Sequence, residues 1–167
     1  MPVQILFLIF ALLQSAPSPA PTVRGDRFQI LVPQGWKVLN EGGYVLLQHS
    51  SGASLLVQRV NRATNLQEYA QQQAERIMAP LGFAKLGEPK SFKNTHDEWV
   101  QYEIRGNRLS EPRRILYQVL RRDTGYFESI YEAGEDRFNS LLSEAQGIAT
   151  SVQGQLAAPP ARRTTRR

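Results

Sequence analysis

The histidines of this chain are the first candidates for chemistry, because imidazole exchanges a proton near neutral pH. His49 directly precedes Ser50, Ser51 and Gly52, so a serine nucleophile with His49 as its base is one interpretation. Adjacent residues of a strand point to opposite faces, however, and the chain lacks the GxSxG turn that presents a nucleophilic serine. The pattern therefore favours a hairpin turn over an active site.

The second histidine begins the run His96, Asp97 and Glu98, which are residue types that bind divalent cations. Consecutive residues rarely point at one ion, and the preceding residues 93–95 are typical of a polar loop. We therefore expect a solvent-exposed loop here, with no bound metal and no cofactor. A metal-dependent hydrolase that uses these three side chains is the alternative.

Four arginines bracket one predicted strand and are candidates for contact with an anion. They are Arg113, Arg114, Arg121 and Arg122. Acidic residues of the same sheet are expected to balance them.

Glu103 and Glu128 lie in neighbouring predicted strands and offer an acid–base pair of the kind that hydrolyses glycosides. Arg105, Arg114 and Arg122 are also nearby, so cross-strand ion pairing is the simpler interpretation.

Trp36 and Trp99 stand near the ends of predicted strands, where each could line a ligand pocket. A large apolar ring in such a place more often belongs to the core. We expect both tryptophans to be core residues.

The composition narrows the possible functions. The chain has no cysteine, which excludes disulfides, thiolate metal sites and cysteine nucleophiles. Its net charge of +5 comes mostly from the last six residues, which contain Arg162, Arg163, Arg166 and Arg167. Because the remainder is close to neutral, the charge does not indicate a specific nucleic-acid partner.

The two ends are expected to lie outside the folded domain. Ile5–Leu13 is an apolar run of signal-peptide length, shorter than the roughly 20 residues of a membrane span, and small residues follow up to Ala20. Residues 1–20 are therefore predicted to be a signal peptide, and the domain is predicted to be extracytoplasmic, either periplasmic or secreted. Retention of this segment as an anchor is the alternative, because no Lys or Arg precedes it and Pro21 follows it.

The other end, residues 155–167, is predicted to be a disordered tail, because it combines prolines with pairs of arginines. A solvated terminus is the favoured interpretation. Weak contact of the tail arginines with an anionic surface is the alternative.

Between the ends, residues 24–154 alternate between hydrophobic periods of two and 3.6 residues. The first strand is predicted at Phe28, with Phe28, Ile30 and Val32 on one face. A helix is predicted from Leu66 to Pro80, capped by Thr64 or Asn65. The other expected elements are strands at 44–48, 54–60, 100–105, 115–120 and 127–131, a loop over 106–112, and a last helix with Glu135 and Asp136 in its first turn.

Short hairpin connections predict a mainly antiparallel β-sheet, and each amphipathic helix must bury its apolar stripe on a sheet face. The prediction is one α+β domain with helices packed on the faces of the sheet.

Four segments of the chain resemble the PsbP-like superfamily, which includes the PsbP subunit of photosystem II and Mog-type Ran release factors. They are FQILVPQGW, NLQEYAQQQAERI, EWVQYEIRG and FNSLLSEAQGIATSV, and the resemblance covers residues 26–153. It implies an α-β-α sandwich and a non-enzymatic accessory or binding role. No metal-, photosystem- or Ran-binding residue of the superfamily can be matched to this chain.

Together these observations predict an exported, non-catalytic binding or accessory subunit of the cell envelope. Its partner is expected to be an envelope protein or another ligand that the sequence does not identify.

Overall fold

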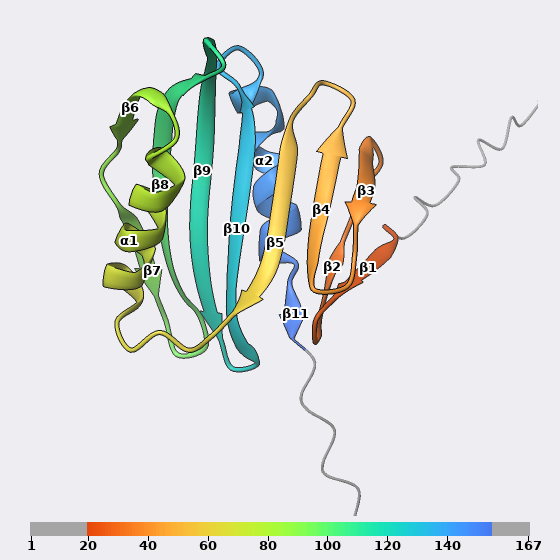
Figure 1. Cartoon of the computed structure of the whole chain (residues 1–167). Helices are drawn as coiled ribbons and strands as arrows, with labels where there is room; N and C mark the ends of the chain where they lie inside the picture. The colour runs from red at the N-terminus through yellow and green to blue at the C-terminus, as the bar shows by residue number, and fades with distance from the viewer. Residues whose placement is uncertain (1–19, 155–167) are drawn as a thin grey trace, which may run out of the picture.

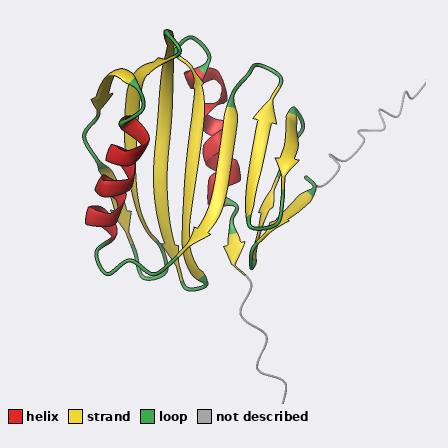
Figure 2. Cartoon of the chain, viewed as in Figure 1, coloured by secondary structure: helices red, strands yellow, loops and turns green. Residues whose placement is uncertain are grey.

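The computed structural model describes residues 20–154 of the chain. Residues 1–19 of the predicted signal peptide lie outside this range, as does the predicted tail with Arg162, Arg163, Arg166 and Arg167. The described part consists mainly of antiparallel strands with two helices (Figure 2), which confirms the predicted α+β class. Neither helix in this range is long and apolar enough to cross a membrane.

The elements follow one another as strands, a helix, strands and a second helix. The strands of the first half are β1 (Thr22–Gly25), β2 (Phe28–Leu31), β3 (Trp36–Asn40), β4 (Tyr44–His49) and β5 (Ser54–Val60). Helix α1 (Leu66–Met78) precedes β6 (Gly82–Leu86), β7 (Lys90–Lys93), β8 (Glu98–Arg108), β9 (Glu111–Arg122) and β10 (Gly125–Gly134). Helix α2 (Phe138–Thr150) and β11 (Gln153–Gly154) complete the described chain.

The strands form two sheets. The larger has eight strands in the order β3-β4-β5-β10-β9-β8-β6, with β7 also paired to β8, and the smaller has the order β1-β2-β11. Figure 1 shows α1 on one face of the larger sheet and α2 on the other. Strand β9 is central, and its residues 114–120 are buried on both faces. This arrangement is the predicted α-β-α sandwich.

Each face of the large sheet has its own core. On the α2 side, Phe28 and Ile30 of β2 pack with Leu47, Leu55 and other inward residues of β4, β5 and β10. On the α1 side, buried residues of the helix pack against β8 and β9. The small sheet therefore shares the α2 side, and α1 is the only described helix on the opposite side.

The start of α1 follows directly from the sequence. Asn65 has an extended backbone, and its side-chain oxygen accepts hydrogen bonds from the backbone N–H groups of Gln67 and Glu68 at 3.1 and 3.2 Å. Such a cap satisfies N–H groups that the first turn of a helix leaves without partners. Of the two predicted caps, Thr64 and Asn65, the structure therefore has Asn65.

A buried carboxylate ties α1 to the sheet. Glu128 of β10 accepts hydrogen bonds from the hydroxyls of Tyr117 at 3.0 Å and Tyr69 at 3.4 Å, and from the side-chain amide of Gln58. Since Tyr69 belongs to α1, the cluster joins the helix to three strands. Burial first, and then the charge of Glu128, raise the pKa of Tyr117 and raise that of Tyr69 to about 12.

Three sequence predictions about element boundaries are wrong. The strand at Phe28 is the second, because Thr22–Gly25 pairs with it as β1. The loop expected over 106–112 is a tight turn, since β8 runs to Arg108 and β9 starts at Glu111. The last helix starts at Phe138, so Glu135 and Asp136 precede it and its first turn contains no acidic residue.

The tight turn explains the second of these errors. Its two central residues, Leu109 and Ser110, have φ angles of 50° and 70°. Turns of this kind usually contain Asn or Gly, which tolerate positive φ at low cost, so a Leu-Ser pair gives no hairpin signal.

The tyrosines around Glu128 predict that the domain loses stability in alkali. A raised pKa means that the folded state holds the phenolic proton more tightly than the unfolded state, for which the pKa is about 10. The contribution of these tyrosines to the free energy of unfolding is therefore complete below about pH 10. It decreases as the pH rises above that value, by up to about 1.4 kcal/mol per pH unit for Tyr117. Chemical denaturation at a series of pH values measures this slope.

Two variants test whether Tyr117 contributes to this loss of stability in alkali. Tyr117→Phe should reduce the alkaline slope while also lowering the stability at neutral pH, because Glu128 loses a hydrogen-bond donor. Tyr44→Phe, at an exposed tyrosine, should leave the slope as it is in the parent chain. Equal slopes in the parent chain and in Tyr117→Phe would contradict the prediction.

Candidate functional site

The four arginines predicted to contact an anion do not form one site. Arg113 and Arg114 lie near the start of β9, and Arg121 and Arg122 lie at its end. Seven residues of extended chain separate Arg114 from Arg121, which corresponds to about 23 Å. The structure therefore separates the predicted rim into two clusters at opposite ends of the sheet.

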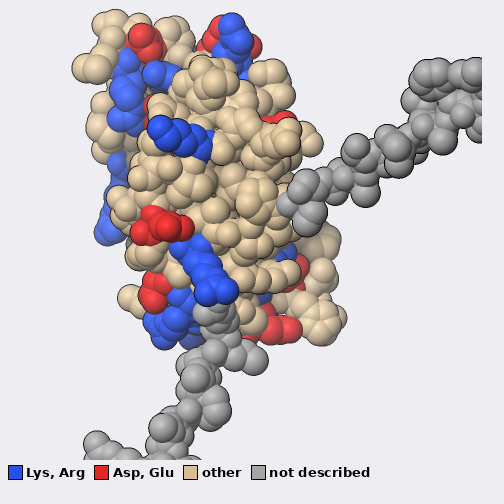
Figure 3. Space-filling model, turned by 90° about the vertical axis from the view of Figure 1, so that its right-hand side faces the viewer, with Lys and Arg blue, Asp and Glu red and all other residues tan. Residues whose placement is uncertain are grey.

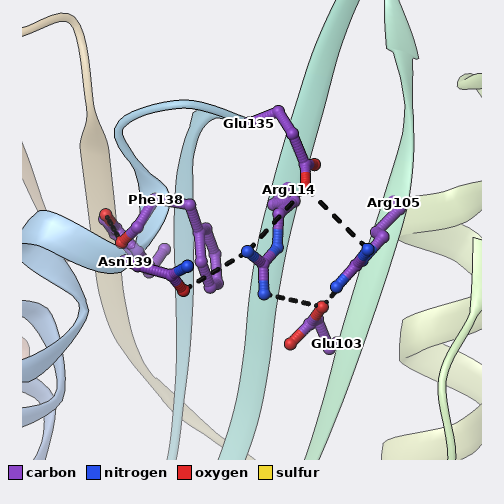
Figure 4. A network of polar contacts seen from close by, with 7 residues as sticks. Glu103, Arg105, Arg114, Glu135, Phe138 and Asn139 are labelled. Atoms are coloured by element: carbon purple, nitrogen blue, oxygen red, sulfur yellow. Dashed lines mark hydrogen bonds and ion pairs between the residues drawn. The ribbon is translucent and has the colours of Figure 1, made fainter.

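Arg114 is the centre of the first cluster (Figure 4). Its guanidinium donates to Glu103 at 2.9 Å and to the side chain of Asn139 at 3.3 Å, and Glu135 lies 3.8 Å away. The guanidinium also lies over the ring of Phe138, 4.2 Å from its centroid. Because Phe138 and Asn139 begin α2, Arg114 fixes the start of that helix on the sheet.

Glu103 is correspondingly held as a carboxylate. Partial burial acts to raise the pKa of Glu103, but hydrogen bonds and charge from Arg105 and Arg114 outweigh it and lower that pKa. The neighbouring Arg113 lies near Glu111 at 3.1 Å and near Glu132 at 3.9 Å. Arg113 and Arg114 are therefore balanced by carboxylates.

Arg122 fixes the end of α2 on the sheet, as Arg114 fixes its start. Its guanidinium donates to the backbone carbonyls of Thr150, at 2.9 Å, and Val152, and its Nε lies 3.4 Å from a carboxylate oxygen of Asp97. The last carbonyls of a helix have no partner within the helix. Arg122 therefore has a structural role, whereas the ion-pair partner of Arg121 among the described residues is Glu98, at 3.3 Å.

The run His96, Asp97 and Glu98 does not converge on one point. His96 pairs with Asp123 at 3.0 Å, Asp97 pairs with Arg122, and Glu98 pairs with Lys93 and Arg121. Within residues 20–154, no three His, Asp or Glu side chains are placed to hold a metal ion. The geometry gives no support to the alternative of a metal-dependent hydrolase at these residues.

His49 contacts Ser51 rather than Ser50. Its Nδ1 lies 2.9 Å from the Ser51 hydroxyl and accepts a hydrogen bond from the Ser51 backbone N–H at 3.2 Å. The same loop is closed by a backbone bond from Gly52 to His49. These contacts stabilise the β4–β5 turn, as the sequence predicted.

Glu103 and Glu128 cannot act on one substrate, because they lie on opposite faces of the sheet. Glu103 lies on the α2 side beside Arg114, whereas Glu128 lies on the α1 side beside Tyr69. The predicted ion pairs of Glu103 are present. The hydrogen-bonded cluster of Glu128 was not predicted.

The two tryptophans contribute to the core to different extents. Trp36 is buried, and its indole N–H donates to Glu144 of α2 at 2.9 Å. Trp99 is half-buried, packs against the α2-side core and stacks on Phe92 with ring centroids 6.1 Å apart. Trp99 and Phe92 also line a pocket of about 260 Å³.

A surface that sequence reasoning missed lies on the α1 side of the sheet. Leu46, Leu56 and Ile130 are cross-strand partners in β4, β5 and β10, so their side chains form one row, and the exposed Tyr44 lies beside it. We call these four residues the open face. In Figure 1 no helix lies over β4, β5 and β10 on the side that faces the viewer, whereas α1 lies over β8.

The row is apolar although it is only half-buried. The other faces of β4 and β5 already supply Val45, Leu47, Leu55 and Val57 to the α2-side core. Sheets with one solvated face usually have polar residues there. The signal in the sequence was the unbroken apolar runs YVLL and SLLV, which put hydrophobic residues on both faces.

The Arg114 cluster predicts the effect of a substitution on stability. Arg114→Met keeps an apolar contact with Phe138 but leaves Glu103 without its less exposed cationic partner, so we expect a loss of about 2 kcal/mol in the free energy of unfolding. Arg105→Met, at a mostly exposed ion pair, should cost much less. Urea denaturation of both variants measures the difference, and similar losses would contradict the buried role of Arg114.

Comparisons with known proteins agree on the fold. No protein-family model and no curated protein matches the chain. Among solved structures, cyanobacterial PsbP (CyanoP) from Synechocystis is 16% identical with a TM-score of 0.58, over 84% of this chain and 95% of that chain. LpqN of Mycobacterium tuberculosis, described as involved in cell envelope biogenesis, is 12% identical with a TM-score of 0.56, over 84% and 87%.

The Ran-binding protein Mog1p of Saccharomyces cerevisiae is 11% identical with a TM-score of 0.53, over 81% of this chain and 96% of that chain. At such identities the likeness concerns the fold alone. The chain has the fold of the PsbP-like superfamily, which confirms the resemblance seen in its sequence.

Proposed function

We propose that this chain is an exported, non-catalytic binding or accessory subunit that docks a partner protein on its open face. The observation that carries the proposal is the apolar row Leu46–Leu56–Ile130, which no described element covers. Apolar surface that remains in contact with water is a common mark of a protein interaction site.

The composition of the surroundings favours a protein over a membrane. The flanking rows contain Gln48, Ser54 and Gln58 on β4 and β5. They continue to Lys37 on β3 and to Glu128 and Glu132 on β10. An apolar centre with a border of polar residues and charges of both signs is typical of a protein interface, whereas membrane-binding surfaces gather basic residues.

The size of the area is consistent with this function. Three strands spaced by about 4.8 Å, over five or six residues each, give about 260 Å². That is enough for the centre of a standard interface of about 800 Å² per partner. Leu39 of the edge strand β3 is also exposed, and Figure 3 shows that uncharged residues make up most of the surface on this side of the molecule.

The non-catalytic part of the proposal is supported by how the reactive side chains are used. Arg114, Arg122 and Glu128 position the helices, and His49 stabilises a turn. The fold neighbours include a Ran-binding protein, which is compatible with a partner-binding role for this chain.

Photo-crosslinking in intact cells tests the docking surface. A photoreactive residue at position 46 or 56 of the full-length chain should give the same cross-linked protein, because both positions lie in one row. The matched control is Gln71, which is exposed on α1. Equal cross-linking from position 71, or cross-links only within the chain itself, would refute the proposal.

Once the partner is identified, Leu56→Glu should weaken its binding at least about tenfold, while Gln71→Glu should leave the binding unchanged. Thermal unfolding of both variants checks that the fold is retained. Catalytic turnover by the purified chain that is lost on a Ser51 or His49 substitution would overturn the non-catalytic role.

The proposal that the chain is exported depends on the predicted signal peptide, residues 1–20, and is tested separately. We expect cell fractionation to place the chain outside the cytoplasm, and mass spectrometry to find a mature N-terminus after Ala20. An intact Met1 in the cytoplasmic fraction would contradict export, and an intact Met1 in the membrane fraction would assign the segment as an anchor.

A further inference from the structure

Two adjoining pockets lie at the end of the sheet where the β7–β8 turn, the β9–β10 turn and the linker before α1 meet. One, of about 300 Å³, is lined by residues that include Asn65 and Lys93. The other, of about 390 Å³, is lined by residues that include Arg62. Arg121 and Tyr126 line both, so the two pockets surround one guanidinium.

Positive charge exceeds negative charge around Arg121. The Lys93 ammonium lies 3.5 Å and the Arg121 guanidinium 3.3 Å from the same oxygen of Glu98, so one carboxylate serves two cations. Arg62 lines the second pocket, is exposed, and has no ion-pair partner among residues 20–154. The other carboxylate of the two pockets, Asp123, lies against His96.

Arg122 also lines the second pocket, but it does not add to this excess. Its guanidinium is used by Asp97 and by the carbonyls that follow α2. The cations available to a ligand are therefore Arg62, Lys93 and Arg121, which come from three separate segments of the chain.

We propose that these pockets bind an oxyanion of the phosphate class, with Arg121 as the central contact and Arg62 and Lys93 at its sides. A guanidinium presents paired N–H groups that match two phosphate oxygens, and an ammonium adds a point charge. Arg62, Lys93 and Arg121 carry three positive charges against the two carboxylates Glu98 and Asp123, so the net charge of these groups favours an anion. The ring of Tyr126 adds a wall for the organic part of a phosphate ester.

This site does not depend on the proposed partner protein, because it shares no residue with the open face. Each proposal can therefore fail while the other holds.

Titration of the full-length chain with inorganic phosphate, followed by amide NMR shifts, tests the site. We expect saturable shifts at Arg62, Arg121 and Tyr126, and weaker shifts with acetate at equal ionic strength. Arg121→Gln should weaken phosphate binding at least about tenfold and Arg62→Ala about threefold, as expected for lost charged hydrogen bonds. Asp123→Asn should act in the opposite direction and tighten binding.

Two control variants separate a site from general attraction. Arg24→Ala removes one exposed positive charge that lines neither pocket. A second control replaces Arg162, Arg163, Arg166 and Arg167 with Gln. If either control weakens phosphate binding as much as Arg121→Gln does, the proposal is wrong. Arg62 and Asp123 are exposed, so their variants remain informative even if Arg121→Gln does not fold.

A further comparison identifies the source of the phosphate. The chain is tested with glycerol phosphate and, separately, with phosphatidylcholine vesicles that contain or lack phosphatidylglycerol. If the chain binds glycerol phosphate, and the variants change this binding in the same order as they change phosphate binding, the ligand is a soluble phosphate ester. If the chain binds only the anionic vesicles, with the variants in that same order, the ligand is a lipid headgroup. Binding to neither probe overturns the proposal.

Discussion

The constraint behind this structure is that two short helices must cover an eight-stranded sheet. Because β6 and β7 both pair with β8, the sheet is seven strands wide, and a spacing of about 4.8 Å makes it about 29 Å wide, whereas a helix with its side chains is about 10 Å wide. On the α2 side, the small sheet β1-β2-β11 supplies part of the missing cover through Phe28 and Ile30. On the α1 side, no described element does the same, so the open face is a direct consequence of the topology.

The same constraint explains why so many charged residues have structural roles. A helix that covers only part of a wide sheet must be held in place, and apolar contacts alone have little directional preference. Arg114 and Arg122 hold the two ends of α2, and Glu128 with Tyr69 holds α1. Residue types that suggested catalysis in the sequence are therefore used for positioning.

The sequence predicted features that depend on neighbouring residues and missed those that depend on strand register. The period-two burial of Phe28, Ile30 and Val32 and the Asn65 cap are local, and the structure confirms both. The Glu128 cluster needs side chains from four elements, and the pockets around Arg121 need three separate segments to meet. Neither arrangement can be derived before the pairing of β5, β10, β9 and β8 is known.

Both proposed binding regions lie on the α1 side of the sheet, and their spacing relates them. Tyr126 of the pockets and Ile130 of the open face belong to β10, four residues apart, which corresponds to about 13 Å. A free phosphate cannot span that distance, whereas a protein with a standard interface covers both regions. If the partner places its own anionic group beside Arg121, phosphate and partner must compete. If it does not, the two bind independently, so the thermodynamic coupling between them reports the charge that the partner presents.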